Sequence, residues 1–211
     1  PPSLPFTLNS AVDNLCKNEF DHYRAKAEPH PMFIEHGIDA VPFAHEKMDE
    51  WRNNFKGIRH IDEVAGYNFG GAVDDIWEKP NGNLIVIDVK STSKNVFDWE
   101  DTYSKWEYAK GYRRQLEMYQ WLLEKNGFNV ASEGYLVYYN GKKHEPMFNQ
   151  QLTFDLHLVK LECDNSWVEE AVLNAKATLD GDMPKPSKTC ENCNYLRKRW
   201  EVSQKKPDNL L

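Results

Sequence analysis

Residues 69–90 have the sequence FGGAVDDIWEKPNGNLIVIDVK. We expect a strand over residues 69–77 and a second strand over residues 84–90, where the β-branched run is typical of a buried strand. The five residues between them, KPNGN, have the composition of a tight turn. The stretch therefore predicts a β-hairpin, around which the rest of the fold can be arranged.

The segments on either side of this hairpin show mainly helical periodicity. Apolar residues recur every three or four positions, and Gly127 is placed to cap the end of a long helix. We expect helices over residues 8–26, 38–55, 103–126 and 166–179, and further strands over residues 135–139 and 152–161. The predicted fold class is α/β, with a central mixed sheet of four or more strands flanked by helices.

Length and composition limit the organisation of the chain. With 211 residues and 40% hydrophobic content, we expect a single domain over 1–211, with its core at about 38–180 and a basic C-terminal segment at 184–211. The sequence lacks an apolar run of roughly 20 residues and has only four cysteines, so we expect a soluble protein of the reducing cytoplasm. The net charge of -7 excludes a protein coated with basic surface and confines any contact with nucleic acid to local patches.

Three charged residues of the hairpin carry the predicted chemistry. Asp88 and Lys90 are two residues apart on a strand, so they share a face, while Val89 points into the core. Asp74 meets this pair only if the turn contains an odd number of residues or a bulge, and we predict that register. Asp75 points to the opposite face and is not expected to be a ligand.

Converging carboxylates can hold a hard divalent cation. Asp74, Asp88 and water supply oxygen ligands suited to Mg²⁺ or Mn²⁺, and the main-chain carbonyl of Val89 is a further candidate ligand. Such an ion activates water and polarises a phosphate, while Lys90 can orient the water and balance charge. The alternative, taking Asp88 and Lys90 alone, is a surface salt bridge on an edge strand.

The order of three motifs gives the pattern its specificity. Gly71-Ala-Val-Asp74 is followed by Asp88-Val-Lys90 and then by Gln115-Leu-Glu-Met-Tyr119 on the predicted long helix. Over roughly residues 66–119 the chain resembles the PD-(D/E)XK nuclease superfamily and, within it, the RecB-like branch. The resemblance implies a restriction-endonuclease-like core.

The same resemblance implies site roles. Asp74 and Asp88 would be metal ligands, Lys90 the catalytic lysine, and Gln115 a residue that positions the site or the DNA. Tyr119 would support Gln115, contact the nucleic acid or pack in the core. Relatives often add a metal-binding histidine upstream. We expect His45 in this role; the alternatives are His36, Glu46, Glu63 and an exposed histidine without a role.

The cysteines resemble those of the iron-sulfur members, which include CRISPR-associated spacer-processing nucleases. Cys16, Cys190 and Cys193 match three expected positions, but Arg199 stands where a fourth cysteine is expected and Cys163 lies far upstream. Because such clusters normally need four cysteines, we expect a metal-free remnant, with an iron-sulfur cluster as the first alternative and zinc as the second.

Basic residues follow the hairpin and suit contacts with backbone phosphates. The candidates for nucleic-acid binding are Lys94, Lys105, Arg113 and Arg114. We therefore expect a DNA nuclease, directed at ends or single strands, that serves DNA repair, recombination or the processing of phage or mobile-element DNA. The alternatives are a non-catalytic nucleic-acid-binding domain with the same fold and an enzyme that processes RNA.

Overall fold

The computed structural model describes residues 7–187 and 189–204. Lys188, Lys205 and Lys206 of the basic segment lie outside the described residues. The chain divides into two compact units, unit 1 over Pro1–Glu170 and unit 2 over Ala171–Leu211, with the division inside α6. The elements, in chain order, are α1 (Thr7–Arg24), α2 (Pro31–Glu35), β1 (Val41–Pro42), α3 (Met48–Trp51), β2 (Ile58–Asp62), β3 (Tyr67–Gly71), β4 (Asp75–Glu78), β5 (Leu84–Thr92), α4 (Trp99–Lys105), α5 (Glu107–Lys125), β6 (Val130–Gly141), β7 (Phe154–Glu162), α6 (Val168–Asp180) and α7 (Glu191–Gln204).

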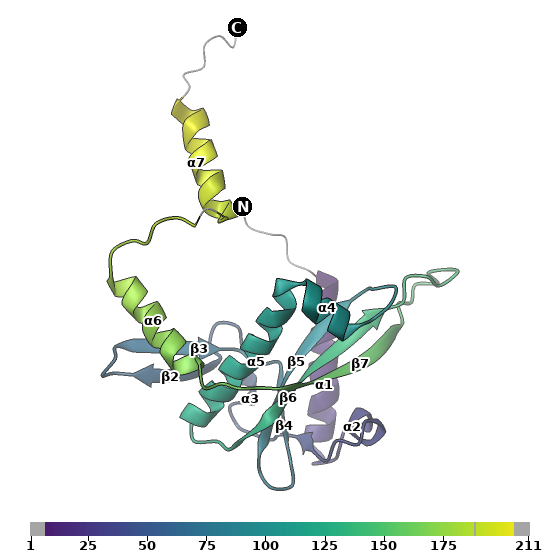
Figure 1. The fold of residues 1–211 in the computed structure, drawn as a ribbon. Coiled ribbons are helices and arrows are strands. Elements are labelled where there is room, and N and C mark those ends of the chain that lie inside the picture. The colour runs from purple at the N-terminus through teal and green to yellow at the C-terminus, as the bar shows by residue number, and fades with distance from the viewer. Residues whose placement is uncertain (1–6, 188, 205–211) are drawn as a thin grey trace. The chain divides into compact units, whose positions relative to one another are not determined.

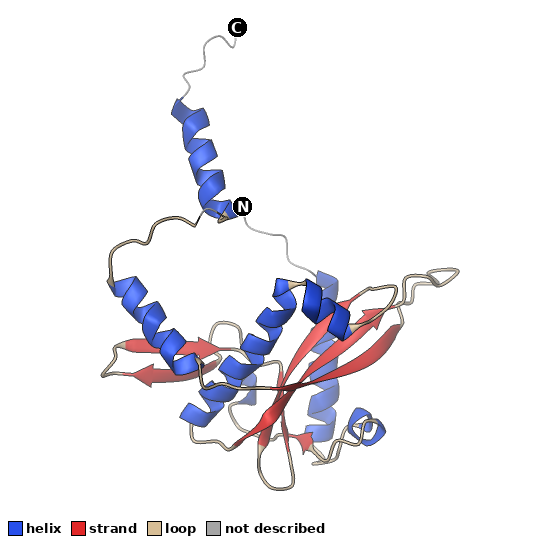
Figure 2. Cartoon of the chain, viewed as in Figure 1, coloured by secondary structure: helices blue, strands red, loops and turns tan. Residues whose placement is uncertain are grey.

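A five-stranded mixed sheet forms the centre of unit 1, in the order β1-β4-β5-β6-β7 (Figure 1). Only β5 and β6 run parallel; the other neighbours are antiparallel. A parallel pair needs a crossover connection, and α4 and α5 supply it between β5 and β6 (Figure 2). The predicted α/β class, a mixed sheet flanked by helices, is confirmed.

Helices cover the two faces of this sheet, with α1 behind it and α5 in front of it in Figure 1. Side chains at odd positions of β5, such as Ile85 and Ile87, join Cys16 and Phe20 of α1 in a buried cluster. Side chains at even positions point to the other face, where Lys90 approaches Gln115 of α5. The core also includes Phe33, so it begins before residue 38. Among the described residues, no helix is long and apolar enough to cross a membrane.

The central hairpin has the predicted turn but a shorter first strand. β4 and β5 pair with Glu78 opposite Leu84, which leaves a turn of residues 79–83 in which Gly82 adopts a positive φ of 80°. The strand expected over residues 69–77 is wrong, because β3 ends at Gly71 and pairs with β2 in a separate two-stranded sheet. The amide of Val73 donates to the carbonyl of Trp51 instead of joining a strand.

Two helix predictions also need correction. The helix expected over residues 38–55 is wrong: this segment contains strand β1 and only one short helix, α3. Pro42 lies in the strand, where a missing amide proton is tolerated at a sheet edge. The helix expected over residues 103–126 is interrupted at Trp106, which has an extended backbone and separates α4 from α5. Gly127, with φ of 88°, follows the last turn of α5 as predicted.

Unit 2 is mainly helical. It contains the greater part of α6 and the whole of α7, whose described side chains include no buried residue. Cys190 directly precedes α7 and Cys193 lies in its first turn, where the Cys193 amide donates to the Cys190 sulfur at 3.4 Å. Hydrogen bonding from this amide lowers the pKa of Cys190 below its ordinary value.

Candidate active site

Two carboxylates meet at the open end of the hairpin. Asp75 pairs with Ile87, so the next position places Asp74 opposite Asp88, in the odd register predicted from the need for these groups to converge. Asp74 Oδ2 accepts a hydrogen bond of 2.7 Å from the amide of Val89, which anchors its side chain beside β5. Asp88 is buried, and Asp74 is close enough to raise its pKa.

Lys90 lies next to this pair and is held by α5. Its ammonium contacts Asp88 Oδ2, lies 3.5 Å from Gln115 Oε1 and is 4.4 Å from the centre of the Tyr112 ring. Gln115 Nε2 in turn donates to the hydroxyl of Tyr119 at 2.7 Å. The four-residue spacing of Gln115 and Tyr119 thus puts both on the helix face that points at the carboxylates.

Gly71 makes room for this helix. A Cβ added at Gly71 would lie 2.5 Å from Cε1 of Tyr119, closer than two carbon atoms that are not bonded to each other can approach. Tyr119 is buried, and burial raises its pKa to about 12, so its hydroxyl stays protonated while it accepts from Gln115. The glycine of one motif and the tyrosine of another are therefore linked by packing.

The environment of Asp88 suits a ligand of a divalent cation. Burial raises its pKa to about 7; the nearby Lys90 ammonium opposes this shift, and the Asp74 carboxylate adds to it. Its Oδ2 atom is buried, and the Lys90 ammonium is its partner. A second carboxylate, that of Asp74, beside this buried ion pair adds negative charge that is costly to hold there. A divalent ion shared with Asp74 would remove that cost, so the donor set fits such an ion.

A buried ion network fixes the strand from behind. Asp75 is fully buried on the face opposite Asp74 and contacts the guanidinium groups of Arg24 and Arg52. Both arginines also contact Asp21 of α1. Asp75 additionally accepts from the amide of Ile76 at 2.7 Å. The network joins α1 and β4 through Arg52, the residue that follows α3. It thereby fixes the position of Asp74, the neighbour of Asp75.

Helix α1 contributes groups that the sequence reasoning missed. Asn9, Ser10 and Asp13 line the same pocket as both carboxylates, a cavity of about 460 Å³. Lys17 Nζ lies 2.8 Å from Asp13 Oδ2 and 3.5 Å from Asp74 Oδ1. The four-residue spacing of Asp13 and Lys17 was the available signal, but it does not show which face of the sheet the helix covers.

The upstream histidine is not brought to this pocket. The His45 ring stacks on Trp51 with centroids 4.3 Å apart and planes 13° apart, and its Nδ1 accepts from the Lys47 amide. The expected α-helix around it does not form, so its side chain turns to this aromatic contact. The alternatives His36, Glu46 and Glu63 do not line the pocket either. Within residues 7–187 and 189–204, no group of three or more His, Cys, Asp or Glu is placed to hold a metal ion.

The basic candidates for nucleic-acid binding are held by partners outside the carboxylate pocket. Lys105 pairs with Asp101 on α4, Arg113 with Glu117, and Arg114 with Glu107 on α5. Lys94 follows β5, where its amide donates to Asn140 Oδ1 at 2.7 Å. None of these four lines the carboxylate pocket.

Cys16 is part of the hydrophobic core of unit 1. Its sulfur accepts a hydrogen bond from the hydroxyl of Tyr139 at 3.3 Å, and burial raises its pKa to about 12. Because metal centres are bound by thiolates, this environment disfavours the alternative in which Cys16 is a cluster ligand. Burial also raises the pKa of Cys163 to about 12.

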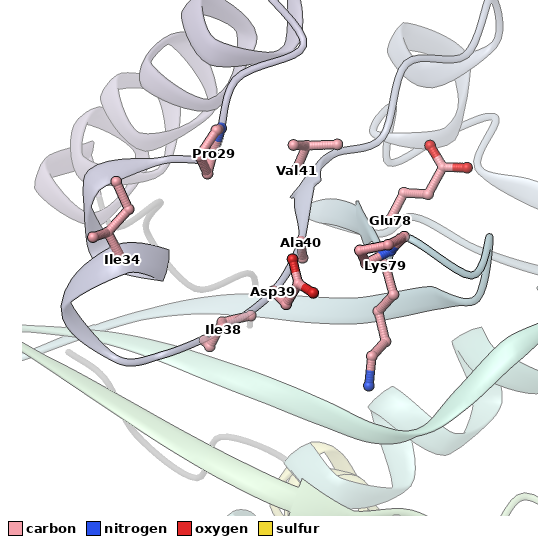
Figure 3. A pocket seen from close by; sticks show the side chains of 9 residues that line it. Pro29, Ile34, Ile38, Asp39, Ala40, Val41, Glu78 and Lys79 are labelled. Atoms are coloured by element: carbon pink, nitrogen blue, oxygen red, sulfur yellow. The ribbon is translucent and has the colours of Figure 1, made fainter.

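A second, larger cavity of about 550 Å³ lies at the opposite end of the hairpin, between the segment after α2 and the β4–β5 turn. Figure 3 shows its apolar lining by Ile34 and Val41. Glu78 and Lys79 extend from it in opposite directions, and Lys79 is paired with Glu133 at 2.7 Å. Its charged groups do not converge, so it lacks the chemistry of the carboxylate pocket.

Comparison with known proteins identifies the family of the chain. The family model of the PD-(D/E)XK nuclease superfamily matches residues 6–197, which is most of the chain. No curated protein matches the sequence. With a mixed sheet flanked by helices and a family match of this extent, the chain belongs to the PD-(D/E)XK nuclease superfamily, whose members are typically metal-dependent nucleases.

Proposed function

We propose that this protein is a DNA nuclease that hydrolyses phosphodiester bonds with Mg²⁺ or Mn²⁺ bound between Asp74 and Asp88. The observation that carries the proposal is the pairing of the two carboxylates across the hairpin, with Lys90 against Asp88. Two adjacent carboxylates repel phosphate, so a binding module has no use for them without a cation. This favours catalysis over the non-catalytic alternative.

Asp74, Asp88 and the carbonyl of Val89 would hold the ion, and water would complete its shell. When bound, the ion supplies Lewis-acid activation of the phosphate and of the attacking water. Lys90 supplies a positive charge at the reacting phosphate and orients the water by hydrogen bonding. Gln115 acts as a positioning residue, because it lies between the Lys90 ammonium and the Tyr119 hydroxyl.

The proposed substrate is a DNA end or a single strand. The chain carries a net charge of -7, so its surface is not built for tight contact with a long duplex. A role in DNA repair, in recombination or in the processing of mobile-element or phage DNA, and membership of the RecB-like branch, belong to the same proposal. An RNA substrate would use the same chemistry.

The test is cleavage of labelled DNA, single- and double-stranded, linear and circular, with an RNA of the same sequence beside it. Lys90→Ala should lower the rate roughly a hundredfold or more. Lys79→Ala is the matched control, because Lys79 lies at the other end of the same hairpin. Linear DNA cut while circular DNA survives would establish end-directed cleavage. Equal rates for Lys90→Ala and the wild type would refute the proposed site, and binding without cleavage would favour the non-catalytic module.

A further inference from the structure

Three cavities follow one another at the end of the sheet that carries the carboxylates. The carboxylate pocket shares Asn9 and Ser91 with a second pocket of about 350 Å³. This second pocket shares Gly141 with a third pocket of about 210 Å³. All three lie in unit 1, around the carboxyl ends of β5 and β6, where open α/β sheets bind their ligands.

The chemistry changes along this row. The first pocket presents the carboxylates and Lys90. The middle pocket has an apolar lining whose largest members are Leu8, Leu152 and Phe154. Leu8 is 59% exposed and Leu152 is 39% exposed, so both are available to a ligand.

The third pocket is basic. It is lined by Lys94, Lys142, Lys143 and His144, together with the acidic Glu145 and Asp155. Lys143 donates to the carbonyl of Ser93 at 2.7 Å, and Lys142 pairs with Asp155 at 2.9 Å. These contacts hold two ammonium groups at one end of the apolar pocket, in a chain that is acidic overall.

From this order we propose that the row binds an unpaired nucleic-acid strand: the scissile phosphate at the carboxylates, one base in the apolar pocket, and a following phosphate at Lys142 and Lys143. A phosphate, a flat apolar base and another phosphate are the repeating chemistry of a single strand. The four steps along the strand from Asp88 to Thr92 cover about 13 Å at the usual rise of a strand, enough for a few nucleotides. A base paired inside a duplex cannot enter the middle pocket. This inference rests on the proposed nuclease function and adds to it a site that selects single strands.

The experiment is fluorescence-anisotropy binding of a labelled single-stranded oligonucleotide to the full chain in EDTA, which stops metal-dependent cleavage. Leu8→Gln/Leu152→Gln should weaken binding about tenfold, the low end of what packing of one base contributes. Leu15→Gln is the control, because Leu15 is also exposed on α1 but does not line the row. Lys142→Gln/Lys143→Gln should lower the slope of log K against log salt by about 0.7, because one phosphate contact is lost on a single strand. Lys26→Gln/Lys79→Gln removes the same charge elsewhere and should leave the slope as in wild type.

An abasic residue moved along the oligonucleotide locates the proposed base site. In the wild type, one position should weaken binding about tenfold, and the leucine double variant should no longer respond to it. The proposed strand path would be overturned if the abasic residue weakened binding equally at every position. It would also be overturned if the leucine and lysine variants bound like their controls. Either result would leave cleavage by the carboxylate site intact. Failure of the wild type to cleave any nucleic acid with Mg²⁺ or Mn²⁺ would instead refute the nuclease function and this inference with it.

Discussion

Asp88 should make the stability of the metal-free protein fall as the pH rises. Burial raises its pKa from 3.8 to about 7 in the folded chain. Between these values the unfolded chain has an ionised Asp88 and the folded chain a protonated one, so the folded state binds more protons. The stabilising contribution of the protonated carboxyl is complete below pH 3.8 and is lost as the pH rises through 7.

The size of the effect follows from that shift. Within the window, each pH unit lowers the free energy of unfolding by about 1.4 kcal/mol, which gives a loss of about 2 kcal/mol between pH 5 and pH 7. Asp88→Asn removes the titrating group while nearly keeping its shape. Its stability at pH 8 should therefore exceed that of the wild type, and the difference between the two proteins should shrink as the pH falls.

Urea unfolding in EDTA at several pH values between 5 and 8 measures this difference. Subtracting the Asp88→Asn curve removes other groups that titrate in this range, including His30, whose pKa is lowered by burial. Mn²⁺ should reverse the loss in the wild type, by about 2.7 kcal/mol at a hundred times its dissociation constant. Wild-type and Asp88→Asn curves that stay parallel from pH 5 to 8 would show that the carboxylate is not held in the environment described.

Three further substitutions test the surroundings of the site. Gly71→Ala should displace Tyr119 and lower cleavage roughly tenfold to a hundredfold in a steady-state assay, with substrate binding less affected; an unchanged rate would contradict the packing argument. Asp75→Asn should destabilise the chain by about 3 to 5 kcal/mol in urea unfolding, because buried arginines lose their partner; a loss below 1 kcal/mol would contradict it. Lys17→Met should tighten Mn²⁺ binding severalfold in calorimetry, since the ammonium 3.5 Å from Asp74 competes with the ion, whereas Lys26→Met should not.

Local sequence signals predicted the parts of the site that lie on the hairpin. The turn KPNGN and the β-branched run over residues 84–90 indicated the hairpin. Its odd register was predicted from the requirement that Asp74 converge with Asp88 and Lys90. The spacing of Gln115 and Tyr119 similarly predicted a shared helix face, because residues four positions apart are neighbours on the surface of any α-helix.

Features that depend on distant contacts were not predictable. The strand predicted over residues 69–77 stops at Gly71, because the amide of Val73 donates to the carbonyl of Trp51, a partner 22 positions away in the sequence. A metal-binding role was predicted for His45 from its position upstream of the motifs, but stacking on Trp51 decides the orientation of its ring. Asp13 and Lys17 look like an ordinary surface pair until α1 is packed against the sheet.

Direct binding of Mn²⁺, followed by electron paramagnetic resonance at pH 8, tests most directly whether Asp74 and Asp88 share one cation. The wild type should remove free Mn²⁺ from solution, and both Asp74→Asn and Asp88→Asn should weaken this binding by at least about tenfold. Asp101→Asn, on the exposed surface of α4, should bind like the wild type. Full Mn²⁺ affinity in either Asp74→Asn or Asp88→Asn would contradict a shared ion.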